Sequence, residues 1–190
     1  MLAPRGLSFE LHANWHQLAD AAKLFAAHPE TVVIVNHMGC PHMGPRTDDA
    51  VLATWRAAIR DLEALPNVYM KASNLEFVRD GWMRDAVRGA SDRRTATRRV
   101  TTHVVHCRSP HASPAQDAYA TAKSMVREVV DVFGEDRVMV ASNFPVDRVT
   151  TGEGMSALYA AMHSLVDDLP LATRVKLFRD NAKRVYKLGA

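Results

Sequence analysis

Four short apolar segments alternate along the chain with longer stretches whose apolar residues recur every three or four positions. The segments are residues 7–13, 31–36, 68–72 and 137–142. The first alternates apolar and polar side chains, which predicts a strand with one buried face. The second is a continuous β-branched run, typical of a strand buried on both faces of a parallel sheet. We therefore predict four strands.

The stretches between these segments have the periodicity of amphipathic helices. Apolar stripes lie within residues 16–27, 51–62, 119–133 and 155–166. We expect Thr47 to cap the second helix and Gly134 to end the third, while residues 143–147 form a loop. Two short helices, at 171–179 and 181–188, finish the chain. A strand–helix alternation of this kind predicts parallel βαβ units.

Four parallel strands with their helices predict an α/β fold equivalent to half of a (β/α)8 barrel, which typically has eight strands in about 250 residues. The pattern is equally compatible with a small doubly wound sheet. All 190 residues are assigned to one partial domain. Residues 79–118 lack apolar periodicity and are rich in arginine, so we interpret them as an irregular insertion within it.

The distribution of charge along the chain bears on whether the protein binds nucleic acid. The chain carries a net charge of +3. Residues 79–111 contain eight Arg and three Asp, a balance of +5, so the remainder carries −2. The basic segment has a single aromatic residue, Trp82, whereas nucleic-acid binders more often interleave basic and stacking side chains. We therefore expect no nucleic-acid partner.

Neither a membrane span nor an export signal is predicted. No stretch reaches the roughly 18 apolar residues of a transmembrane helix, and the first six residues lack the apolar core of a signal peptide. Cys40 and Cys107 have no neighbouring partner. We expect a cytoplasmic protein with free thiols.

Polar side chains follow the predicted strands, where active sites of parallel α/β folds assemble. His12 follows the first strand, His37 the second, and Lys71 and Ser73 end the third. Imidazole can accept a proton, and Lys71 would suit an anionic substrate. We predict His37 as catalytic and the other three as substrate contacts. The alternatives are that His37 bonds backbone groups, that His12 only packs, and that Lys71 is a surface lysine.

The fourth strand contributes two further candidates. Asn143 ends it and could orient a substrate carbonyl, but an amide is no base at neutral pH. Asp147 lies four residues later and could act as a base, although a turn-capping role is the alternative. We predict both as catalytic residues.

No metal site is predicted in this chain. His103, His106, Cys107 and His111 have a spacing that fits no strong zinc template. Their segment is rich in arginine, whose charge would repel a cation.

Three motifs and the C-terminal tail resemble one known family. The motifs are Val-Ile-Val-Asn-His-Met-Gly-Cys-Pro at 33–41, Pro-Asn-Val-Tyr-Met-Lys-Ala-Ser at 66–73, and Phe-Gly-Glu-Asp-Arg-Val-Met-Val-Ala-Ser-Asn-Phe-Pro-Val-Asp at 133–147. The tail, 181–186, reads Asn-Ala-Lys-Arg-Val-Tyr. They are similar to those of amidohydrolase-related proteins, described as metal-dependent hydrolases of the TIM-barrel fold.

The resemblance implies the C-terminal half of such a barrel, strands five to eight. It also implies hydrolysis of a small ester, lactone or amide, here one that bears a carboxylate. His37 would correspond to the family's active-site histidine on strand six. In the family, a strand-eight carboxylate activates water, sometimes with a divalent metal.

Two departures from the family pattern change these expectations. The His-x-His pair of strand one is missing, and Asn143 replaces the strand-eight Asp. A bound metal is therefore not expected here, although full-length relatives could hold one, and Asp147 or His37 would carry the proton. The alternative to an enzyme is a truncated, non-catalytic fragment, or a half-barrel that needs a complementing half or forms a homodimer.

Overall fold

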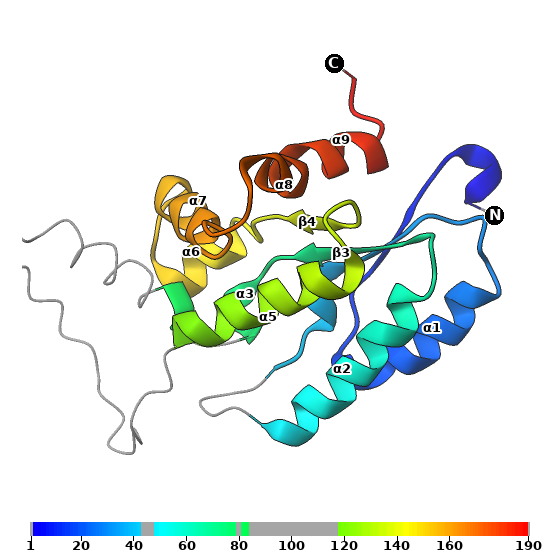
Figure 1. The fold of residues 1–190 in the computed structure, drawn as a ribbon, viewed down its shortest axis with the longest axis horizontal. Coiled ribbons are helices and arrows are strands. Elements are labelled where there is room, and N and C mark those ends of the chain that lie inside the picture. The colour runs from blue at the N-terminus through cyan, green and yellow to red at the C-terminus, as the bar shows by residue number, and fades with distance from the viewer. Residues whose placement is uncertain (1, 43–47, 79–80, 84–117, 190) are drawn as a thin grey trace, which may run out of the picture.

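The residues that the structure describes form one parallel sheet of four strands. The computed structural model describes residues 2–42, 48–78, 81–83 and 118–189 (Figure 1). The strands are β1 (Phe9–Leu11), β2 (Val33–Val35), β3 (Val68–Ala72) and β4 (Val138–Val140). They lie in the order β1-β2-β3-β4, and all neighbours are parallel. The four predicted strands are confirmed, and the order has no reversal of the kind that a doubly wound sheet contains.

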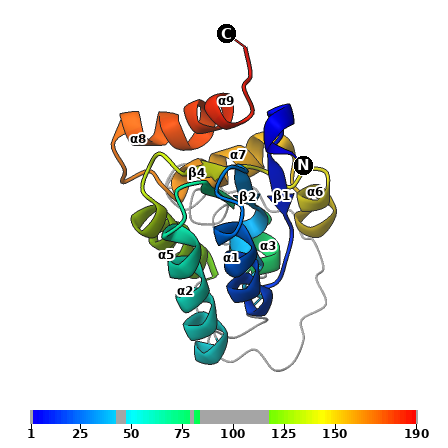
Figure 2. The same ribbon diagram turned by 90° about the vertical axis from the view of Figure 1, so that its right-hand side faces the viewer.

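Helices pack around one face of this sheet. Figure 2 shows α1 (Leu18–Ala26), α2 (Asp49–Glu63), α5 (Ala118–Phe133), α8 (Leu171–Val175) and α9 (Asn181–Val185) in an arc around the strands. Buried residues of α1, α2 and α5, and Leu177 just after α8, belong to one apolar cluster with Val138 and Val140, which lie on the same face of β4. The stripes of α1, α2 and α5 are buried against the strands, as predicted. The other elements among the described residues are η1 (Ala3–Arg5), η2 (Trp15–Gln17), η3 (Asn36–Gly39), α3 (Leu75–Val78), α6 (Val146–Thr151), α7 (Met155–Ser164) and η4 (Lys176–Asp180).

The helix ends follow simple capping rules, with one correction. Gly134 ends α5 at φ +75° and donates its N–H to Val130, as predicted. The cap of α2 is Asp48, whose Oδ1 accepts the N–H groups of Ala50 and Val51, and not Thr47, which lies outside the described residues. An ionised carboxylate also suits the positive end of the helix dipole.

Two predicted boundaries differ from the structure. The loop expected at 143–147 runs into α6, which begins at Val146. The two C-terminal helices form one continuous run, because the π-helical turn η4 joins α8 to α9 without a break. Local periodicity does not reveal such a join, since both halves keep their own apolar stripe.

Most of the predicted insertion at 79–118 lies outside the described residues. Its described residues are 81–83 and Ala118, which begins α5. Trp82, Met83 and Ala118 pack into the core, at 2%, 0% and 5% exposed. These residues are therefore not an irregular surface segment.

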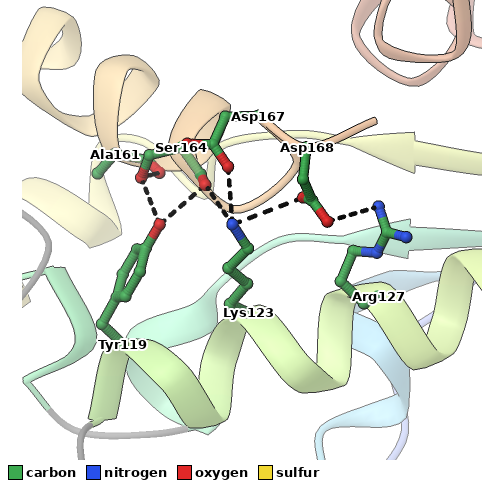
Figure 3. Close-up of polar contacts among 7 residues, drawn as sticks. All are labelled: Tyr119, Lys123, Arg127, Ala161, Ser164, Asp167 and Asp168. Atoms are coloured by element: carbon green, nitrogen blue, oxygen red, sulfur yellow. Dashed lines mark hydrogen bonds and ion pairs between the residues drawn. The ribbon is translucent and has the colours of Figure 1, made fainter. Parts of the chain in front are cut away.

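Polar contacts fix α7 against α5 (Figure 3). The Tyr119 hydroxyl donates to the carbonyl oxygen of Ser164 at 2.8 Å. Lys123 Nζ lies 2.7 Å from Asp167 and also contacts Asp168, which Arg127 approaches as well. The segment that follows β4 is thereby held near the sheet.

No helix in the described part of the chain is long and apolar enough to cross a bilayer.

Candidate active site at the strand ends

Three of the six predicted site residues meet where β1, β2 and β3 end. His37 Nδ1 lies 2.8 Å from the Oγ atom of Ser73. The ring of His12 stands edge-on to that of His37, with the ring centroids 4.9 Å apart. Ser73 is buried, His37 is half-buried and His12 is exposed. The buried side of this cluster therefore holds the hydrogen bond between His37 and Ser73, and the imidazole of His12 lies on the exposed side.

An unusual turn aims His37 at Ser73. His37, Met38, Gly39 and Cys40 all have positive φ, between +48° and +73°. Non-glycine residues seldom adopt this conformation, and such strain persists where the surroundings enforce it. Here Met38 is fully buried, and its carbonyl oxygen accepts the Trp55 Nε1–H at 2.7 Å. The interior of the fold therefore holds the turn that carries His37.

The imidazole of His37 is neutral near pH 7. Burial, together with the nearby His12 and Lys71, lowers its pKa to about 4, against the opposing effect of the Glu10 carboxylate. A neutral imidazole has one nitrogen that donates and one that accepts, and the Ser73 hydroxyl can pair with either form of Nδ1, because a hydroxyl both donates and accepts. If Nδ1–H donates to Ser73, Nε2 is free to accept a proton.

A second polar cluster, centred on Glu10 and Lys71, lies on the same face of the sheet, one layer of side chains back from the strand ends. Glu10 precedes His12 by two residues and Lys71 precedes Ser73 by two, so the layers are about 7 Å apart. Lys71 Nζ and Asn36 Nδ2 donate to Glu10 Oε2 at 3.0 and 3.1 Å. The Tyr186 hydroxyl, just after α9, donates to Glu10 Oε1 at 2.6 Å.

This ion pair sets the charge of the lower layer. Partial burial raises the pKa of Glu10, but hydrogen bonds from Tyr186, Asn36 and Lys71 outweigh it and lower the pKa overall. The ammonium of Lys71 also lies 5.5 Å from the centre of the Tyr186 ring. Lys71 is thus not a free cation, contrary to the simplest reading of a lysine at a strand end.

Glu10 and Tyr186 are site residues that were not predicted from the sequence. Glu10 could have been found, because it shares its strand face with His12 at a spacing of two. Tyr186 belongs to the tail motif, but nothing local places it beside a residue 176 positions away.

Asn143 and Asp147 form a closed turn after β4. Asp147 Oδ2 accepts the N–H of Asn143 at 2.6 Å, and the Asp147 N–H donates to the Asn143 carbonyl at 3.1 Å. Asp147 is 4% exposed, and burial raises its pKa while the Asn143 N–H opposes that shift. Within the described residues no hydrogen bond or ion pair joins either residue to His37. The geometry is that of the turn-capping alternative.

Nearly the whole sequence matches one protein family. The sequence profile of the family described as Amidohydrolase aligns with residues 1–188. This chain belongs to the amidohydrolase family. The resemblance seen in the three strand motifs is therefore confirmed.

Two curated relatives of this amidohydrolase cover nearly all of its sequence. An uncharacterised protein, y4mH, of Sinorhizobium fredii is 28% identical over 187 residues, which are 98% of this chain and 49% of the relative. L-fucono-1,5-lactonase of Burkholderia multivorans is 31% identical over 178 residues, which are 90% of this chain and 48% of the relative. The chain spans about half the length of the curated relatives it matches.

Solved structures share the fold. An amidohydrolase from Burkholderia multivorans, crystallised with zinc, matches with a TM-score of 0.73 and 23% identity, over 98% of this chain and 55% of its own. A Pseudomonas putida protein named for 2-pyrone-4,6-dicarboxylic acid hydrolysis matches with a TM-score of 0.65 and 15% identity, over 99% of this chain and 54% of its own.

The described residues do not supply a complete metal site. No three His, Cys, Asp or Glu side chains among them lie close enough together to hold one ion. His12 and His37 alone would offer two ligands, and His37 Nδ1 is engaged by Ser73. We assign no catalytic step to a metal. Cys40 is no nucleophile either, because burial raises the pKa of its thiol to about 11.

Proposed function

We propose that this amidohydrolase is equivalent to strands five to eight of a (β/α)8 barrel and hydrolyses a small lactone, ester or amide. The unreversed parallel order of the four strands supports the barrel assignment. Family membership and the similarity to a lactonase support the reaction. The observation that carries the proposal is the contact between His37 and Ser73 at the strand ends.

His37 is the proposed base. With Nδ1–H donated to Ser73, Nε2 would accept a proton from a water molecule that attacks the substrate carbonyl carbon. The ester C–O bond then breaks, and His37 returns the proton to the leaving oxygen. A lactone becomes a hydroxy acid. The carboxylate of Glu10, one layer below, favours the imidazolium that forms in between.

The other strand-end residues would bind and orient the substrate. His12 and the Asn143 amide are placed at the ends of β1 and β4, where they would contact the ring and its carbonyl oxygen. Asp147 holds the N–H of Asn143, so we propose that it acts by fixing that loop. A carboxylate on the substrate was expected because Lys71 could bind it, but the charge of Lys71 is already balanced by Glu10.

A second candidate function is that of a half-barrel completed by another chain. Within the described residues β1 and β4 each pair with one neighbour, so both edges of the sheet are open. An apolar pocket of about 240 Å³ flanks β1, lined by side chains that include Leu2, Phe9 and Leu24. A homodimer or a complementing half-barrel would cover these surfaces.

Two measurements test the proposal. Turnover of a panel of small lactones, esters and amides by the purified chain, followed as acid release, tests the reaction, and hydrolysis of none of them would contradict it. Sedimentation velocity tests the second candidate. A defined dimer with native circular dichroism is expected for paired half-barrels, whereas a folded monomer would reject pairing between copies.

A further inference from the structure

We propose that Glu10 is a specificity-determining residue, which selects neutral ligands at the strand ends by occupying the Lys71 ammonium. The inference rests on the proposed function and refines it: the substrate is a neutral lactone or ester and not a carboxylate-bearing one. It reverses what a lysine in this position suggests from sequence alone.

The contacts of Glu10 leave little freedom for its carboxylate. Three donors from three separate elements hold it: Lys71 on β3 at 3.0 Å, Asn36 in η3 at 3.1 Å and Tyr186 after α9 at 2.6 Å. The Lys71 side chain is 17% exposed and that of Glu10 is 40% exposed. The anion is therefore the more accessible partner of the pair.

The balance of charge in the site follows from these contacts. Glu10 and Lys71 cancel, and His37 is neutral near pH 7. A ligand carboxylate would have to share the ammonium with Glu10 and would be repelled by it at close range. A neutral ring pays no such penalty, and its hydroxyl groups can donate to the Glu10 carboxylate.

Removing the charge of Glu10 tests this inference through ligand binding. The probes are 2-pyrone-4,6-dicarboxylate, a dianionic lactone, and δ-valerolactone, a neutral one. Their dissociation constants are measured by NMR titration of the wild-type chain, Glu10→Gln and Asp20→Asn. The last variant is the matched control, because it also removes one carboxylate from an ion pair with a lysine, at the exposed surface of α1.

We expect Glu10→Gln to bind the dianion about tenfold more tightly, with δ-valerolactone changed by less than about twofold. Asp20→Asn should change neither constant by more than about twofold. Adding Lys71→Met to Glu10→Gln should abolish the gain, since the gain depends on the freed ammonium. Circular dichroism establishes that each variant is folded.

Three outcomes would overturn the inference: unchanged or weaker binding of the dianion to Glu10→Gln, an equal gain for both probes, or binding of the dianion to neither chain. The readout is separate from turnover. A chain that hydrolyses nothing but shows the predicted shift in affinity would refute the proposed function and keep the inference. Hydrolysis without the shift in affinity would support the proposed function and refute the inference.

Discussion

Gly39 lies so close to Leu18 that a Cβ atom on the glycine would be 2.3 Å from Leu18 Cδ1. The contact packs the turn that carries His37 against α1. Gly39 is also at φ +73°, within the left-handed turn. The position of the candidate base is therefore tied to the packing of α1.

Gly39→Ala should destabilise the fold by about 2–4 kcal/mol, because it adds both backbone strain and a clash with a buried side chain. Gly134→Ala is the control. Gly134 has a similar φ of +75°, but nothing lies within 4 Å of its added Cβ, so it should cost about 1 kcal/mol. Urea unfolding measures both. Equal losses would show that the contact with Leu18 is unimportant.

The protonation of His37 should contribute to the pH dependence of stability. Its pKa falls from 6.5 to about 4 on folding, chiefly through burial. Between these values the unfolded chain binds a proton that the native chain does not. The contribution is complete above pH 6.5 and is lost as the pH falls towards 4.

NMR titration of the histidine rings, with urea unfolding at several pH values, tests this. His37→Asn should lose stability less steeply than the wild type between pH 6.5 and 4. Asparagine is chosen because it tolerates positive φ. A His37 ring that titrates near 6.5 would contradict the assigned environment.

Asn181 should be a stability residue of the C-terminal helical run. It is fully buried, and its Nδ2 donates to the carbonyl oxygens of Glu135 and Val138, both at 2.7 Å. Asn181→Ala leaves these carbonyls without the amide and should cost about 2–3 kcal/mol in urea unfolding. Asn67→Ala removes a similar pair of bonds at a more exposed position, so a loss of about 1 kcal/mol is expected. The reverse order would refute the account.

Asp147 should act through the shape of the loop after β4. Asp147→Asn keeps an oxygen that can accept the Asn143 N–H but removes the charge. We expect it to retain turnover within about threefold, whereas Asp147→Ala should lose about 1–2 kcal/mol of stability as well as activity. Loss of turnover by more than about a hundredfold in Asp147→Asn, with stability unchanged, would instead identify a catalytic base.

The sequence predicted the strands and the main helices because both depend on local periodicity. The meeting of His37 with Ser73 was also predictable, since parallel strands bring their carboxyl ends to one edge. These inferences need only the pattern of the chain and the direction of its strands.

The features that the sequence did not reveal depend on distant contacts. Nothing local indicates that Glu10 receives the Tyr186 hydroxyl, or that Met38, a non-glycine residue, adopts φ +53°. The burial of Asp147 likewise follows from the start of α6, where periodicity predicted a loop. Each of these is decided by packing between elements and not by the residues next to it.

The most direct test of the proposed activity is the ratio of kcat/KM for L-fucono-1,5-lactone between the wild-type chain and His37→Asn, with Asp20→Asn as control. We predict that His37→Asn lowers kcat/KM by at least about a hundredfold, while Asp20→Asn stays within about twofold of the wild type. Equal turnover by the wild type and His37→Asn would contradict the central claim, because hydrolysis would then not depend on the imidazole at the strand ends.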